Sequence, residues 1–94
     1  MATKSRMTQD MDTCYVCGGR ATEMHHIFYG TANRKIADKY GYVVPLCHEC
    51  HQGPRGVHFN KGLDHALKVM GQQDFIANLG DTNDFRRLFG KSYL

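Results

Sequence analysis

The residue types with the greatest capacity for chemistry in this chain are its four cysteines, which form two pairs. Each pair, Cys14-Tyr-Val-Cys17 and Cys47-His-Glu-Cys50, has two residues between its thiols. Two such pairs separated along the chain are typical of a four-cysteine zinc site, in which thiolates surround the ion at about 2.3 Å. We therefore expect Cys14, Cys17, Cys47 and Cys50 to bind a structural Zn²⁺. Disulfides are the alternative, and reducing conditions in a cytoplasmic protein would disfavour them.

Four histidines lie close to the cysteine pairs in the sequence: His25, His26, His51 and His58. Neutral imidazoles bind divalent ions through one ring nitrogen, and a carboxylate such as Glu23 or Asp38 can fix the other. A second metal site is therefore one interpretation of these histidines. The alternative is that one or two of them complete the zinc site, for example His51 in place of Cys50.

Composition limits the class of protein. The 94 residues suffice for one domain with a thin apolar core, since a domain of this size buries only about 60–65% of its unfolded surface. The net charge of +3 suits a polyanionic partner without requiring one. The polar N-terminus does not look like a secretory signal, and no run approaches the roughly 20 apolar residues of a membrane span. We expect a cytoplasmic protein without membrane contact.

The pattern along the chain predicts an α+β domain over residues 13–94, preceded by a flexible tail over residues 1–12. Short strands are expected within residues 22–29 and 42–47, joined by a connection that carries one helical turn. A helical extension follows over about residues 60–94. Its first helix is expected to be capped by Asn60 and stopped by Gly80, and its second to be capped by Thr82 and stopped by Gly90.

The order of the motifs resembles a known family. The first cysteine pair is followed by Glu-x-His-His-Ile, from Glu23 to Ile27, and then by VVPLCHECH, from Val43 to His51. This order resembles the HNH endonucleases, which fold as a ββα-metal motif. It is similar in particular to small HNH nucleases encoded by phages and prophages of Gram-positive bacteria. The resemblance extends from Cys14 to about Asn60, and its motifs are specific in combination although each is weak alone.

The resemblance implies roles for three histidines. In the family, the first of the two adjacent positions before the apolar residue is a metal ligand and the second is the general base, which correspond to His25 and His26. The residue after the second cysteine pair is the other ligand, here His51. The catalytic ion would be divalent, with Mg²⁺, Mn²⁺, Ni²⁺ and Zn²⁺ as candidates. For His58 we keep three alternatives, namely a further metal ligand, a phosphate contact and a surface histidine.

One position departs from the family pattern. The family's asparagine lies at the start of the second strand and ties the connecting loop to the strand that bears the base, whereas Tyr42 occupies this position here. Asn33, in the connecting segment, is a candidate to replace it, and we include it among the catalytic residues. We also expect a geometric adjustment, because adjacent residues of a regular strand point to opposite faces. An irregularity is then required to turn His25 and His26 toward one phosphate.

The chemistry of phosphodiester hydrolysis agrees with these roles. The reaction needs an activated water, charge relief at the phosphate and stabilisation of the leaving oxygen, and a divalent ion supplies the last two. A histidine with an ordinary pKa of about 6.5 is largely neutral at cytoplasmic pH and can take the proton from water. Basic residues near the proposed ion would contact DNA phosphates, in a manner weakened by salt: Arg34, Lys35, Arg55 and Lys61. Arg34 is the foremost of these because it is expected beside the ion, and we include it among the catalytic residues.

The sequence therefore predicts a metal-dependent DNA endonuclease or nickase. The alternative is a catalytically weak or inactive, zinc-stabilised module for DNA binding or recombination, in which Tyr42 marks lost catalysis. A weaker alternative is a metal-sensing or protein-binding zinc ribbon, which would not bind DNA. Besides DNA, the partners considered are a second copy of the chain and a larger phage or recombination protein.

Overall fold

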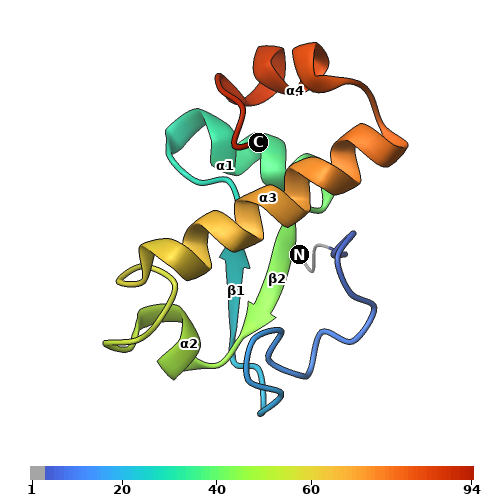
Figure 1. Ribbon diagram of the computed structural model, residues 1–94. Helices are drawn as coiled ribbons and strands as arrows, with labels where there is room; N and C mark the ends of the chain where they lie inside the picture. Colours follow the sequence, from blue (N-terminus) through green and yellow to red (C-terminus); the bar gives the residue numbers. More distant parts are fainter. Residues whose placement is uncertain (1–3) are drawn as a thin grey trace.

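An antiparallel pair of short strands lies among the helices of the computed structural model, which describes residues 4–94 (Figure 1). Strand β1 (Glu23–His26) pairs with β2 (Val43–Leu46), so that His25 is opposite Val44 and His26 is opposite Val43. All four residues of β2 are buried, whereas His25 is the one fully buried residue of β1. Both strands fall within the predicted ranges, and the α+β class is confirmed.

Helix α1 (Thr31–Tyr40) joins the two strands. The sequence predicted a single helical turn here, and that prediction is wrong because the helix has 10 residues. Ala37 is its one buried residue, and the partly buried Ile36 and Tyr40 also pack against the hydrophobic core. Gly41 ends it with a φ of 82°, in the left-handed region that favours glycine. A Cβ at Gly41 would also lie 2.7 Å from the carbonyl oxygen of Lys4.

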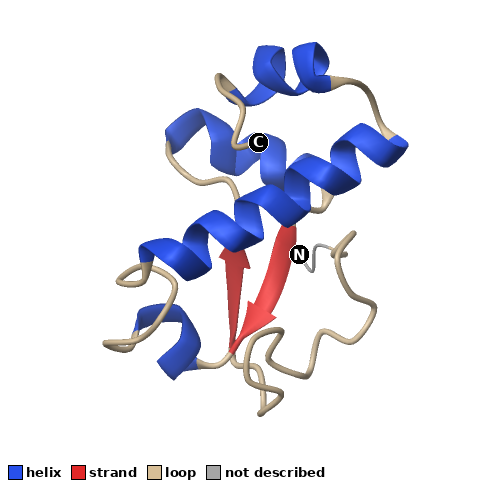
Figure 2. Ribbon diagram, viewed as in Figure 1, coloured by secondary structure: helices blue, strands red, loops and turns tan. Residues whose placement is uncertain are grey.

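Three further helices complete the fold (Figure 2). The short α2 (His48–Gln52) follows β2, the long α3 (Lys61–Asn78) crosses the strands, and α4 (Thr82–Phe89) packs against α1 and α3. Within residues 4–94, no helix combines the length and the apolar character needed to cross a bilayer.

Of the two N-terminal capping residues predicted from the sequence, one is confirmed. As predicted, the side chain of Asn60 caps α3 by accepting a hydrogen bond from the N–H of Leu63, at 3.0 Å. The cap of α4 is Asp81 and not Thr82, because Asp81 and Asp84 exchange hydrogen bonds with each other's backbone N–H in a capping box. The predicted stop at Gly90 is confirmed.

A cluster of aromatic rings holds the helices to the end of β1. Phe28, two residues after β1, is fully buried, and its ring centroid lies 4.4 Å from that of Phe89 and 5.7 Å from that of Tyr42. Helix α3 approaches this ring at Gly71, where a Cβ would lie only 2.9 Å from Phe28. The core therefore fixes α3 and α4 relative to the strand that carries the adjacent histidines.

Residues 4–12 contact the domain, although the sequence led us to expect a flexible tail with nothing to pack. The N–H of Arg6 donates to the carbonyl of Gly41 at 2.8 Å, and its Nε lies 2.9 Å from a carboxylate oxygen of Asp74 on α3. Met7 packs against the hydrophobic core. This segment therefore links the end of α1 to α3, and residues 1–3 of the expected tail lie outside the described residues.

Candidate metal centres

The four cysteines form one cluster. Their Sγ atoms lie within 4.8 Å of one another, and the Sγ atoms of Cys17 and Cys47 are 3.7 Å apart. Four thiolates at about 2.3 Å from one tetrahedral ion would be about 3.8 Å apart. All four thiols are free of disulfides. The cluster is therefore compatible with a zinc site in which the protein supplies every ligand.

Backbone amides organise these thiols. The N–H of Cys17 lies 3.5 Å from Sγ of Cys14, and the N–H of Cys50 lies 3.4 Å from Sγ of Cys47. Burial raises the pKa of Cys14, but hydrogen bonds from backbone N–H groups outweigh burial and lower that pKa to about 6. Burial and the neighbouring thiols raise the pKa of Cys50. A bound divalent cation would favour the deprotonated form of these thiols, because thiols that coordinate a metal lose their protons.

The cysteine cluster joins the first cysteine pair to β2 and α2. The N–H of Tyr15 donates to the carbonyl of Pro45 at 2.8 Å, and the N–H of Thr22 donates to that of Leu46 at 3.0 Å. Cys47 caps α2, which places Cys50 one turn further along the same helix. The segment before β1 and the segment after β2 therefore meet at the four sulfurs.

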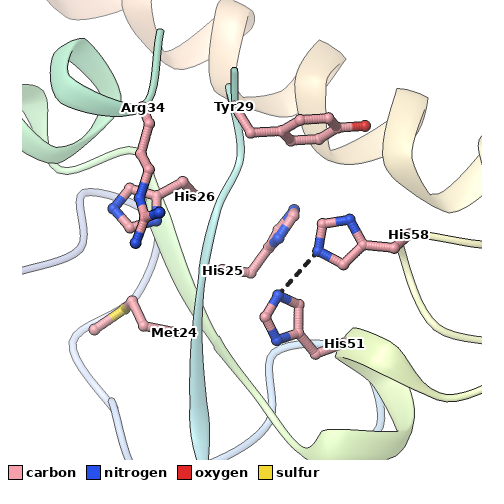
Figure 3. A pocket seen from close by; sticks show the side chains of 7 residues that line it. All are labelled: Met24, His25, His26, Tyr29, Arg34, His51 and His58. Carbon is pink, nitrogen blue, oxygen red and sulfur yellow. Dashed lines mark hydrogen bonds between the residues drawn. The ribbon is translucent and has the colours of Figure 1, made fainter. Parts of the chain in front are cut away.

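Three histidines form a second cluster, which we call the histidine cluster: His25 from β1, His51 from α2 and His58 from the loop before α3 (Figure 3). One ring nitrogen of each lies within 4.8 Å of the others. The Nε2 atoms of His51 and His58 are 3.1 Å apart. Two nitrogens that bind one ion at about 2.0–2.1 Å would be about 2.9 Å apart in octahedral and about 3.4 Å in tetrahedral geometry. The observed spacing fits a shared ion.

His25 contributes a buried ring nitrogen that has no hydrogen-bond partner among residues 4–94. Its residue is 2% exposed, and within the described chain no group hydrogen-bonds to its Nε2. Burial, followed by the proximity of His51 and His58, lowers the pKa of His25 to about 3. Its ring is therefore uncharged at neutral pH. An unpaired buried polar group costs about 1–3 kcal/mol, and a bond from this ring to a metal would remove that cost.

Glu23 fixes the ring of His51. One carboxylate oxygen lies 2.7 Å from Nδ1 of His51, and the other lies 2.8 Å from Nδ1 of His48. Because a carboxylate only accepts hydrogen bonds, Nδ1 of His51 carries the proton and Nε2 presents its lone pair toward His58. Hydrogen bonds from His48 and then from His51 hold the pKa of Glu23 below its usual range. The sequence predicted such a carboxylate partner, and Glu23 provides it.

The loop over residues 53–59 returns His58 to α2. The N–H of Val57, a buried residue, donates to the carbonyl of Cys50 at 2.7 Å. A Cβ at Gly56 would lie 2.8 Å from the carbonyl oxygen of Glu49, so the loop folds tightly onto the helix. Of the three alternatives left open for His58, the structure favours a further metal ligand. Gly53 and Gly56 are the sequence signal that could have indicated this turn, although they do not indicate which side chain the turn would bring to α2.

His26 lies on the other side of β1 from the histidine cluster, beside Arg34 (Figure 3). The expected strand irregularity is absent from β1, because its four residues pair consecutively with those of β2. The rings of His25 and His26 nevertheless line one pocket of about 200 Å³. The other five residues that line it are Met24, Tyr29, Arg34, His51 and His58. Alternation along β1 therefore separates His26 from the ligands without removing it from their pocket.

The two residues discussed as tethers for the base lie elsewhere. Nδ2 of Asn33 donates to the carbonyl of Phe89 at 3.2 Å, so Asn33 is tied to the end of α4 and not to the strand that bears His26. It is also absent from the described residues that line the pocket. Tyr42 is fully buried in the aromatic core, and its hydroxyl donates to Asp74 on α3 at 2.9 Å. We therefore do not carry Asn33 forward as a catalytic residue.

Tyr42→Asn, which restores the family's residue type, is expected to destabilise the domain by about 3–5 kcal/mol, because it removes a ring from a fully buried position and leaves a cavity. Tyr42→Phe is the matched control. It keeps the ring and loses the hydrogen bond to Asp74, at about 1 kcal/mol. Chemical denaturation of both variants measures the difference. A Tyr42→Asn variant as stable as the wild type would show that this side chain does not support the core.

The basic residues predicted to meet DNA are all exposed: Arg34, Lys35, Arg55 and Lys61. Arg34 is the one among them that lines the pocket of the histidines. On α1 it lies next to His26, across β1 from the histidine cluster, so its expected place beside the ion stays a prediction.

Comparison with protein-family models, with curated proteins and with solved structures finds no match for this chain. The functional assignment therefore depends on the residues of the two clusters and on their geometry.

Proposed function

We propose that this protein is a metal-dependent DNA endonuclease or nickase of the HNH type. The observation that carries the proposal is the histidine cluster of His25, His51 and His58, with His26 outside the cluster but in the same pocket. In this proposal the cysteine cluster holds a structural Zn²⁺, whose four protein ligands leave no position for a substrate.

The histidine cluster suits catalysis better than a structural role. Three imidazoles leave coordination positions open for water and substrate, which is the arrangement of catalytic metal sites. A divalent ion held there would relieve the charge of the scissile phosphate and stabilise the leaving oxygen. Glu23 orients His51 toward the cluster, and burial keeps His25 neutral and available as a ligand.

His26 supplies the general base in this proposal. It takes a proton from a water molecule, whose oxygen attacks phosphorus as the bond to the leaving 3′ oxygen breaks. Its place across β1 from His25 keeps its ring away from the ligand positions. Two adjacent histidines can therefore perform two different tasks, one as ligand and one as base.

DNA is the proposed substrate because its phosphates would pair with a cation at the pocket. The net charge of +3 and the exposed Arg34 at the pocket favour a polyanion. Strands β1 and β2 pair, with α1 between them in sequence, and α2 follows β2; candidate ligands on β1 and α2 then support the ββα-metal arrangement that the family resemblance implies.

The test is conversion of supercoiled plasmid to nicked or linear DNA, with Mg²⁺, Mn²⁺, Ni²⁺ or Zn²⁺ supplied in turn. We expect cleavage with at least one of these ions and none after the divalent ion is removed. His51→Ala is expected to lower cleavage by at least about 100-fold and to weaken binding of the added ion in calorimetry. His65→Ala, which removes an exposed histidine on α3 outside both clusters, is the matched control.

Two outcomes would contradict the proposal. Cleavage that survives in His51→Ala at the wild-type rate would point to a contaminating nuclease. DNA binding without cleavage under all four ions would favour the alternative of a zinc-stabilised DNA-binding or recombination module.

A further inference from the structure

We propose that Asp38 is the positioning residue for His26, with its carboxylate accepting the Nε2–H of the imidazole so that Nδ1 is left as the basic nitrogen. The inference rests on the proposed function, because it assigns a partner to the proposed base. It adds a residue that neither the cysteine cluster nor the histidine cluster contains.

The contact joins two different elements of the fold. Nε2 of His26, on β1, lies 3.3 Å from Oδ1 of Asp38, on α1. The side chain of His26 is 16% exposed and that of Asp38 is 43% exposed. The imidazole is therefore largely enclosed, whereas its carboxylate partner is partly open to solvent. The ring is therefore held from the side of α1, away from the histidine cluster.

The chemistry of the pair decides the proton position. A carboxylate at neutral pH only accepts hydrogen bonds, so the shared proton lies on Nε2 of His26. In the neutral ring the other nitrogen, Nδ1, then carries the lone pair that can take a proton from water. The same carboxylate would stabilise the imidazolium formed after that transfer, as a buried aspartate does for the histidine of a serine protease.

Helix α1 is anchored well enough to hold Asp38 in place. Near its start, Asn33 is bonded to the carbonyl of Phe89, and the residue that caps its end, Gly41, accepts a hydrogen bond from the N–H of Arg6. Ala37, next to Asp38, is fully buried. Arg34 lies one turn before Asp38 and lines the pocket, so a single helix presents both a cation and the carboxylate to His26.

This arrangement offers a physical answer to the missing family asparagine. The sequence raised doubt about how the segment between the strands is tied to the strand that bears the base. Tyr42 makes no such tie, because its hydroxyl is bonded to Asp74 in the core. The Asp38–His26 contact joins the connecting segment to β1 directly.

The test compares Asp38→Ala and Asp38→Asn with Asp12→Asn, which removes an exposed carboxylate outside the pocket. We expect Asp38→Ala to lower kcat for plasmid nicking by on the order of 10–100-fold, with the KM for DNA and the affinity for the added ion unchanged. Asp38→Asn keeps an acceptor oxygen and should lose less. In a His26→Ala background, Asp38→Ala should have no further effect, since the carboxylate acts through that ring.

Proton NMR of the imidazole N–H groups gives a readout that does not depend on cleavage. The Nε2–H resonance of His26, assigned by its loss in His26→Ala, should be visible in the wild type and in Asp12→Asn and should disappear in Asp38→Ala. A resonance unchanged in Asp38→Ala would overturn the inference, and so would losses of kcat that multiply in the double variant. If the wild type cleaves no DNA with any of the four ions, the proposed function fails, and the resonance alone then decides whether Asp38 holds the ring.

Discussion

Cys47→Ser is expected to leave the protein largely unfolded. Structural zinc supplies about 10–16 kcal/mol of apparent binding free energy in small domains, whereas a whole domain is stable by only about 5–15 kcal/mol. The four sulfurs join the first cysteine pair to α2, and a domain of 94 residues has little core to replace that link. Circular dichroism should show loss of helix, and elemental analysis should show one zinc ion fewer per chain than in the wild type.

The control for Cys47→Ser is a serine substitution at a neighbouring position that carries no thiol. Glu49→Ser changes an exposed residue between Cys47 and Cys50 without removing a thiol, and it should keep the helix content and the zinc of the wild type. Cys14→Ser, on the other side of the cluster, should behave like Cys47→Ser. Full helix content in the wild type after complete chelation would show that the cysteine cluster is not needed for folding.

His26→Ala is expected to lower the rate of DNA cleavage by about 10²–10⁴-fold, the usual effect of losing a general base, while binding of the divalent ion stays measurable. Ion binding should persist because His26 lies across β1 from His25 and is not part of the histidine cluster. His25→Ala should lose both cleavage and ion binding, because it removes the buried nitrogen of the cluster. Plasmid nicking and calorimetry with the same ion measure the two effects.

Comparison of His26→Ala with His25→Ala separates loss of the base from general damage to β1. His26→Ala and His25→Ala alter neighbouring residues of one strand, so general damage to β1 would affect both variants alike. Cleavage by His26→Ala at the wild-type rate would rule out its role as the base. Loss of ion binding in His26→Ala would instead place its ring among the ligands.

The parts of the structure that local sequence dictates were predicted well. The spacing within each cysteine pair predicted that the pairs would meet, and Cys17 and Cys47 do lie together. The adjacency of His51 to Cys50 placed His51 near both clusters, and the structure assigns it to the histidine cluster. The side chain of Asn60 is a local helix signal that needs no tertiary contact to be recognised.

The parts that depend on distant contacts were not predicted. Helix α1 packs against α4 and β1, and Ile36 and Tyr40 contact the hydrophobic core, so tertiary contacts support a longer helix than the single turn that was predicted. His58 reaches the histidine cluster only because the loop after α2 turns back on that helix. The ion pair of Arg6 with Asp74 joins residues 68 positions apart, and no local pattern of the N-terminal segment could signal it.

Helix α2 carries ligands of both clusters within five residues, with Cys50 and His51 as neighbours. Two ions held by one short helix would not bind independently, because an ion that orders the helix for one site also orders it for the other. Such coupling is reciprocal, so the factor by which zinc tightens the second ion is the factor by which that ion tightens zinc. Removal of the ion from the cysteine cluster would then weaken binding of the ion at the histidine cluster, so depletion at one site would appear in an assay as reduced affinity at the other.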